Sequence, residues 1–192
     1  MQQRREANAL VADLFEQVGL RADVLERLRT AHGLSPAVRR EALAVAQAYV
    51  ANAFTLNVFA RERVRLPGAE MSGYRNALSC SEEACRLEPQ NGDYLNTLGA
   101  AYYRVSNYEL ALATLLRSEE INQPQSQGSM PAALAFLAMT RHHLGHPEEA
   151  KAELQRLRER MKDPRWAQDG KAQGFLREAE ALLAEPETPG GK

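Results

Sequence analysis

Three histidines lie close together in the sequence and are of the type that binds zinc. His142 and His143 are adjacent, and His146 follows Gly145. A zinc site needs several ligands that converge on one point. On a helix, however, His142 and His143 point about 100° apart, and His146 falls in a turn beyond Gly145. The spacing favours surface histidines, and we expect neither a metal site nor a cofactor.

The two cysteines are the other candidates for chemistry. Cys80 and Cys85 are five positions apart in a helical pattern, which separates them by about 140° around the helix axis. This geometry suits neither a metal-ligand pair nor a local disulfide, so we expect reduced packing residues. No serine, cysteine or carboxylate cluster has a placed base, and no glycine-rich phosphate loop occurs. We therefore expect a protein that is not an enzyme.

Composition restricts the fold and the partners. The 192 residues fit one domain or two small ones, and good helix formers outnumber β-branched and aromatic residues, which predicts an all-α fold. The net charge of −1 argues against binding to nucleic acid or anionic lipid. No stretch approaches the roughly 20 apolar residues of a membrane span, and the polar, basic start of the chain does not resemble a secretory signal. We expect a cytoplasmic protein.

One short pattern occurs three times, at Leu56–Ala60, Leu95–Gly99 and Leu134–Ala138, each 39 residues after the last. It consists of a leucine, two spacers, a second apolar residue and then glycine or alanine. On a helix, the two apolar residues share one face and the small residue leaves room for a second helix to approach. The pattern predicts a helical hairpin built three times.

The residues before these repeats predict three more helices. The first spans about 4–18 and ends at Gly19, the second closes near Gly33, and the third begins near 36 with Ser35 as its cap. The apolar pattern leaves open whether the third helix breaks near Asn52 or runs on into the first repeat, and we favour a break. Residues 1–52 are expected to pack on the repeats.

The repeats themselves are predicted at about 53–90, 91–122 and 131–161. Their helices span 53–65 and 74–87, 93–105 and 108–121, and 131–144 and 148–161. A solvent-exposed, mobile loop is expected at 122–130. After Trp166, a last helix at about 171–184, within the segment 162–184, should cap the open end of the stack. Residues 185–192 are expected to be a disordered tail.

The second unit resembles the tetratricopeptide repeat. The resemblance rests on positions between Tyr94 and Asn122, namely Leu95, Leu98, Gly99, Tyr102, Ala111 and Leu115. Helix B of the first unit, with Ala77, Ala84, Leu87 and Pro89, follows the usual 34-residue spacing, and two turn insertions stretch the interval to 39. The resemblance covers about 53–160 and implies a right-handed α-solenoid of three hairpins.

Some residues depart from the family pattern. Arg63 and Arg141 stand where the family prefers tyrosine, and Gln123 stands where its terminal proline would be. A looser resemblance, from about Leu20 to Phe175, is to repeat segments of large multidomain bacterial proteins with serine/threonine kinase or WD40 modules. It implies a regulatory or scaffolding portion, although nothing in the chain resembles a kinase domain.

In the tetratricopeptide family, the first helices of the hairpins line a concave groove that takes a peptide or a helix. Carried over by position, the partner-binding residues are Asn57, Arg61, Arg65, Asn96, Tyr103, Arg104, Met139, His142 and His143. The arginines and histidines make this strip locally basic, which suits an acidic segment or a terminal carboxylate. Thr97, Ala132 and Phe136 do not supply the basic carboxylate clamp of some members, so that chaperone-related role is disfavoured.

Two functions follow from the sequence. The first is a non-catalytic protein–protein interaction module, a scaffold or adaptor that binds a peptide or helix in the groove. The alternative is a structural or regulatory segment that acts through self-assembly, or as part of a larger signalling complex, by its outer face and N-terminal helices. The oligomeric state and the partner stay open at this point.

Overall fold

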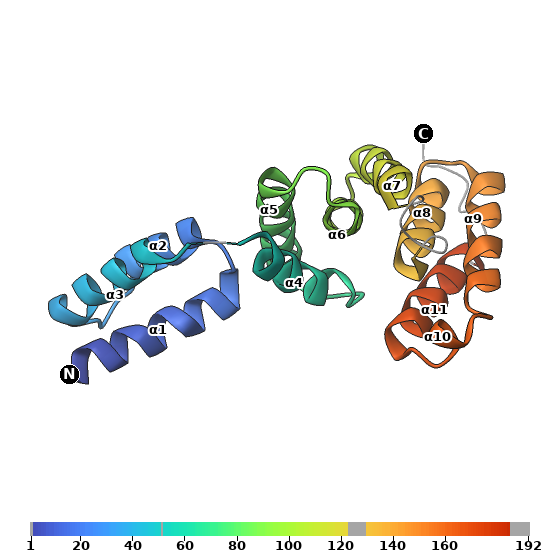
Figure 1. Ribbon diagram of the computed structural model, residues 1–192. Helices are drawn as coiled ribbons and strands as arrows, with labels where there is room; N and C mark the ends of the chain where they lie inside the picture. The colour runs from blue at the N-terminus through green and yellow to red at the C-terminus, as the bar shows by residue number, and fades with distance from the viewer. Residues whose placement is uncertain (1, 51, 123–129, 185–192) are drawn as a thin grey trace.

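Every regular element is a helix in the computed structural model, which describes residues 2–50, 52–122 and 130–184 (Figure 1). The described helices are α1 (Gln2–Val18), α2 (Arg21–Thr30), α3 (Pro36–Ala48), α4 (Ala53–Val64), α5 (Met71–Leu87), α6 (Gly92–Arg104), α7 (Tyr108–Asn122), α8 (Pro131–His143), α9 (Pro147–Arg160), α10 (Pro164–Ala167) and α11 (Gly170–Ala184). They form an all-α solenoid in which three hairpins, α4–α5, α6–α7 and α8–α9, follow one another. Residues 123–129 of the predicted loop and the predicted tail lie outside the described residues.

Side-chain caps explain where several helices begin. Ser35 Oγ accepts the Val38 N–H at 3.2 Å, and Pro36 takes the first helical position. Asn52 Oδ1 accepts the Thr55 N–H at 2.7 Å, so α4 starts as a separate helix and the predicted break is confirmed. The same type of cap begins α6, α10 and α11, at Asn91, Asp163 and Asp169.

The small residue of the repeated pattern lies where paired helices touch. A Cβ added to Gly99 of α6 would lie 2.5 Å from Leu115 Cγ of α7 and 2.8 Å from its Cδ2. Ala60 and Ala138, at the same place in the other hairpins, are fully buried. This confirms that the bare backbone beside the second apolar residue lets a neighbouring helix come close.

Helices α1–α3 enclose a hydrophobic core of their own and lie to one side of the repeats (Figure 1). Their contact with the first hairpin is at the corner between α1 and α2. Gly19 has φ +75°, and a Cβ there would lie 2.6 Å from Cys80 Sγ and 2.9 Å from the Phe59 ring. Only glycine fits this corner, both for its backbone conformation and for its space.

Arg63 strengthens this contact. Its guanidinium lies over the Phe59 ring, 3.3 Å from the centroid, and donates to the Glu16 carbonyl at the end of α1 at 2.6 Å. Arg63, which stands where the tetratricopeptide pattern prefers tyrosine, therefore attaches the first hairpin to α1.

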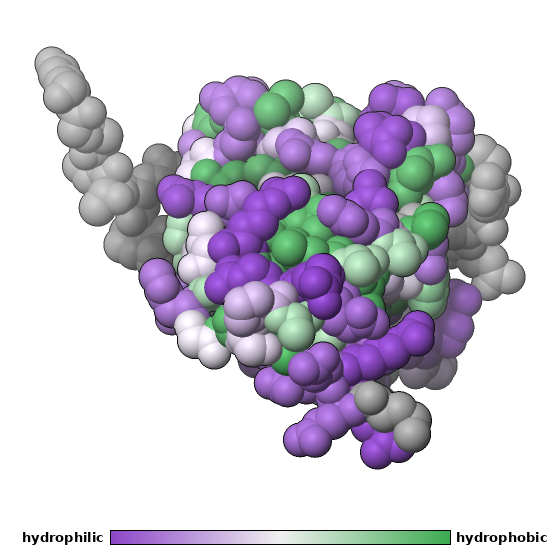
Figure 2. All heavy atoms as spheres, turned by 90° about the vertical axis from the view of Figure 1, so that its left-hand side faces the viewer, coloured by the Kyte–Doolittle hydropathy of each residue, from purple (hydrophilic) through white to green (hydrophobic). Residues whose placement is uncertain are grey.

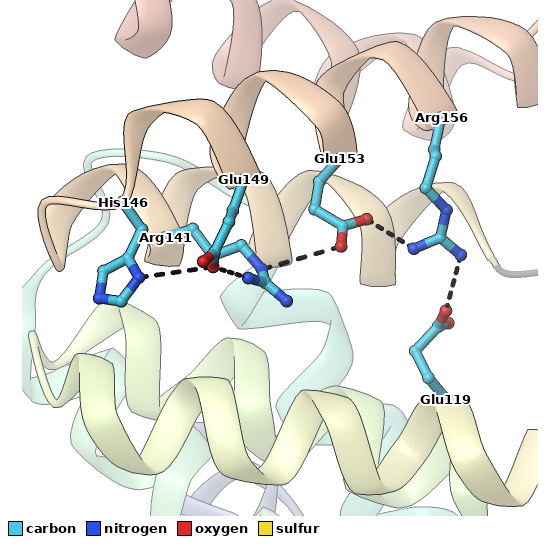
Figure 3. Close-up of polar contacts among 6 residues, drawn as sticks. All are labelled: Glu119, Arg141, His146, Glu149, Glu153 and Arg156. Atoms are coloured by element: carbon cyan, nitrogen blue, oxygen red, sulfur yellow. Dashed lines mark hydrogen bonds and ion pairs between the residues drawn. The ribbon is translucent and has the colours of Figure 1, made fainter.

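The second departure, Arg141, belongs to a chain of ion pairs that joins α7, α8 and α9 (Figure 3). Arg141 forms an ion pair with Glu149, and Arg141 Nε lies 3.7 Å from a carboxylate oxygen of Glu153. The Nδ1 atom of His146 lies 3.4 Å from the carboxylate of Glu149. Arg156 continues the chain, at 2.7 Å from Glu153 and 3.3 Å from Glu119 of α7. The chain connects the second hairpin to the third.

Both cysteines are buried free thiols. Burial raises the pKa of Cys80 to about 12 and that of Cys85 to about 11. Thiolate is the reactive form of cysteine, so both residues serve packing, as predicted.

No single helix in the described ranges has both the length and the apolarity for crossing a membrane. The bent pair α3 and α4 reaches these criteria only when the two helices are taken together, by length and composition alone.

Candidate functional site

A pocket of about 490 Å³ lies on the concave side of the solenoid, and we call it the inner-face pocket. Three walls are the inner faces of α4, α6 and α8. Helix α4 contributes Phe54, Asn57 and Arg61, α6 contributes Asp93 and Asn96, and α8 contributes Phe136. The fourth wall is made by α10 and α11, with Trp166, Lys171 and Phe175. The first helix of each hairpin thus contributes to the lining of this pocket, and the C-terminal helices enclose it further.

Helix α11 forms this wall because it turns back toward the first hairpin. Its Lys171 Nζ lies 3.0 Å from Glu62 Oε1 of α4, and its Phe175 ring packs edge-on against Phe136 of α8 at 5.7 Å between centroids. The sequence predicts a helix that covers the end of the stack. The structure adds contacts to the inner faces of α4, α6 and α8.

Two side-chain amide oxygens of residues that line the pocket lack hydrogen-bond partners among the described residues. Asn57 Oδ1 on α4 and Asn96 Oδ1 on α6 are buried and accept no hydrogen bond from the residues that the structure describes. Buried amide oxygens are nearly always paired in native proteins. Their equivalent places on neighbouring helices, 39 residues apart, fit the predicted role of hydrogen bonding along a bound chain.

The indole of Trp166 adds a third unpaired group. Its Nε1 donor is buried without an acceptor among the described residues. Trp166 stands on the single turn of α10, which Asp163 caps at 2.9 Å through the Arg165 N–H. Residues that line the pocket therefore carry two acceptors and one donor without partners among the described residues.

The charges of the pocket are mixed, although the sequence predicts a basic strip. Arg61, Arg65 and Lys171 face Glu62, Asp93 and Asp169. Glu62 takes up two of the cations, Lys171 at 3.0 Å and Arg65 at 2.6 Å, and the Lys171 hydrogen bond is the main cause that lowers its pKa. Arg61 is exposed and makes no ion pair with the described residues, which leaves it as the cation available to a ligand.

Arg104 lies beneath α11 instead of on the open surface. Its Nε donates to the Val64 carbonyl at 2.7 Å, and its two terminal nitrogens meet both carboxylate oxygens of Glu178. The side chains of Arg104 and Glu178 are 6% and 16% exposed. A partner reaches Arg104 only where α11 has moved away.

The remaining predicted residues lie away from the pocket. Met139 is fully buried in the core, so it offers no contact to a partner. His143 stacks on Tyr108 with ring centroids 4.4 Å apart, and the Tyr103 hydroxyl lies 3.4 Å from its Nε2. Burial, followed by the neighbouring His142, lowers the pKa of His143, and burial raises that of Tyr103. These groups form an aromatic cluster at the end of α6 and α8.

The structure therefore brings together four of the nine predicted residues, namely Asn57, Arg61, Arg65 and Asn96. Sequence reasoning missed Trp166, Lys171 and Phe175, because it assigned the last helix to the end of the stack. The sequence feature that could have indicated them is the single tryptophan, Trp166, followed by a helix that carries the charged residues Lys171 and Glu178. Within the described ranges, no three His, Cys, Asp or Glu side chains gather as metal ligands.

Comparison with known proteins yields structural likeness only. The sequence matches no protein-family model and no curated protein. It is similar to the NMR structure of the first TPR domain of human RPAP3, with 20% identity and a TM-score of 0.48 over 69% of this chain and 92% of that one. The first TPR of Spaghetti (RPAP3), solved bound to the HSP90 peptide SRMEEVD, gives 19% identity and a TM-score of 0.47 over 69% and 94%.

Proposed function

We propose that this protein is a non-catalytic interaction module that binds a short peptide segment of a partner protein in the inner-face pocket. The observation that carries the proposal is the pair of unpartnered amides, Asn57 and Asn96, in equivalent places on α4 and α6. An unpaired buried amide costs about 1–3 kcal/mol, and a peptide backbone supplies the missing N–H groups at regular intervals. The pocket is therefore suited to main-chain recognition.

The surroundings of the amides indicate the side chains that a ligand would carry. Phe54, one turn before Asn57, is 67% exposed and offers an apolar contact at the pocket. Arg61, one turn after Asn57, offers a guanidinium that pairs with none of the described residues, and guanidinium groups bind carboxylates well. A segment with an apolar residue beside an acidic one fits this stripe on α4.

The test is a selection of peptides from a random phage-displayed library on the full chain, followed by affinity measurement with the selected peptides. We expect Asn57→Leu with Asn96→Leu, and separately Arg61→Glu, to weaken binding at least about tenfold. Arg75→Glu is the matched control, because Arg75 is also exposed but lies on α5, outside the pocket.

Equal affinity for the wild type and both pocket variants would show that the peptides bind elsewhere. Selection of no peptide that distinguishes the pocket variants from the wild type also counts against the proposal. Circular dichroism of each variant confirms that the helices are intact.

The expected compartment is the cytoplasm, since free thiols fit a reducing environment.

A second candidate, self-assembly through α1–α3, is favoured by one observation. A hollow on α3 and the turn before it is lined by Leu34, Pro36 and Leu43 and bordered by Arg39 and Arg40. Figure 2 views the molecule from the side of α1–α3 and shows apolar side chains gathered in the middle of this face, with polar ones around them. Light scattering over a range of concentrations tests this candidate: a strict monomer excludes it, and an oligomer lost in Leu43→Glu supports it.

A further inference from the structure

Besides its pairing with Glu178 of α11, Arg104 makes several contacts within the repeats. Its Nε bonds to the last carbonyl of α4, and its guanidinium carbon lies 5.1 Å from the Phe136 ring of α8 and 5.7 Å from those of Tyr74 and Tyr103. These contacts orient the two terminal nitrogens toward the concave side. The repeats thus form a carboxylate-binding site, and α11 contributes only the carboxylate of Glu178.

Helix α11 is attached shallowly. Two of its fifteen residues are buried, and both are alanines, Ala172 and Ala179, whereas its larger apolar side chains pack against the core only partly buried: Phe175, Leu176, Leu182 and Leu183. By contrast, α8 buries nine of its thirteen residues. The remaining attachments of α11 to α4 and α6 are polar, Lys171 to Glu62 and Glu178 to Arg104. Burial of apolar surface is the main source of docking free energy, so α11 is held more weakly than the helices beneath it.

The docked face of α11 has a simple pattern. Ala172, Phe175, Glu178 and Ala179 lie at positions i, i+3, i+6 and i+7, which share one side of a helix. Phe175 contacts Phe136, and Glu178 contacts Arg104. Any helix with this pattern of small, aromatic and acidic residues presents the same groups.

We propose that the surface beneath α11 is a helix-binding site, that α11 is its intramolecular occupant, and that its external partner is an amphipathic helix whose carboxylate replaces Glu178 on Arg104. This helix-binding site deepens the proposed function and rests on it, because both place the partner on the concave side of the solenoid. It differs in being centred on Arg104, at the C-terminal end of α6, where the inner-face pocket uses Arg61, Asn57 and Asn96.

The probe is a fluorescent peptide with the sequence of residues 168–184, added to the full chain. Phe175→Ala with Glu178→Gln loosens α11 and leaves Arg104 without its carboxylate. We expect this variant to bind the peptide at least about tenfold more tightly than the wild type does. A peptide that carries Glu178→Gln should bind this variant at least about tenfold more weakly than the unchanged peptide does. Glu180→Gln is the matched control, because Glu180 lies on the same helix but pairs with Arg158 of α9 at 2.9 Å.

Equally weak binding to the wild type and to the loosened variant overturns the proposal, as does binding that ignores the peptide's glutamate. If the loosened variant fails to fold, hydrogen exchange of the wild type decides: amides of 170–184 should exchange faster than those of 131–143, and equal protection would make α11 a fixed part of the core. Adding Arg61→Glu to the loosened variant should leave helix binding unchanged, which separates this site from the inner-face pocket.

Discussion

Arg104 and Glu178 lie 74 residues apart in the sequence, yet both terminal nitrogens of the guanidinium meet both oxygens of the carboxylate. The pair joins the end of α6 to the middle of α11. It is the most buried ion pair within the described residues, with side chains 6% and 16% exposed. The stability of α11 on the concave surface depends on it.

We expect Glu178→Gln to lower the free energy of unfolding by about 1–3 kcal/mol. Removing one partner of a buried pair costs roughly 3–5 kcal/mol when the other charge stays buried, but here Arg104 regains water if α11 detaches. The cost is therefore limited to the docking free energy of α11. Urea unfolding measures it, and Glu180→Gln, at an exposed pair, should change it by under about 1 kcal/mol. Global unfolding in Glu178→Gln would contradict shallow docking.

Gly99→Ala should destabilise the protein by about 1–3 kcal/mol, because its Cβ would clash with Leu115 Cγ at 2.5 Å and approach the Leu115 backbone N at 3.3 Å. Gly174→Ala, inside α11, meets nothing within 4 Å and should stabilise the helix by roughly 0.5–1 kcal/mol. Thermal unfolding of both variants gives the comparison. An unchanged or raised stability of Gly99→Ala would show that packing at Gly99 does not limit the approach of α7.

Asn57→Leu and Asn96→Leu should leave stability unchanged or raise it by up to about 2 kcal/mol, since each removes a buried acceptor that has no partner among the described residues. The same variants are expected to lose peptide binding, so function and stability would move in opposite directions. Differential scanning calorimetry checks the first half. A large loss of stability would mean that both amides serve the fold.

The ion-pair chain of Figure 3 should contribute to the contact between the second and third hairpins. Glu153 bridges Arg141 and Arg156 and its side chain is 10% exposed, so Glu153→Gln should cost about 1–3 kcal/mol. Glu148→Gln, which affects the exposed pair with Lys151, should cost under about 0.5 kcal/mol. Urea midpoints distinguish the two, and equal effects would mean that the chain adds nothing beyond surface ion pairs.

Acid should weaken the contact between α11 and α4. The Lys171 hydrogen bond lowers the folded pKa of Glu62 below its ordinary value of 4.5, so the unfolded state binds this proton first. The stabilisation is complete above pH 4.5 and is lost as the pH falls through the folded pKa. Urea midpoints of wild type and Glu62→Gln should therefore converge on acidification. A constant difference between them would contradict the assignment.

Much of the helical architecture could be predicted from short-range signals. The Ser35–Pro36 cap, the positive φ of Gly19 and the close approach at Gly99 all depend on local conformation or on one neighbouring helix, and the sequence pattern carries both. The break before α4 follows from the Asn52 cap, although the apolar pattern alone leaves it open.

The candidate site was harder to predict, because it depends on contacts between distant segments. Helical periodicity places Arg104 and Met139 on an inner face. It does not reveal that α11 covers Arg104 or that Met139 is buried in the hydrophobic core. Trp166 and Lys171 reach the pocket only through the turn of α10 and the path of α11, which no local rule specifies.

The link from Lys171 to Glu62 has a mechanical consequence for the solenoid. In an open array each repeat touches only its neighbours, so the array bends elastically along its length. Here α11 packs on the third hairpin and bonds to the first, which acts as a brace across the bend. We expect release of α11 to remove this brace and to make the solenoid easier to bend.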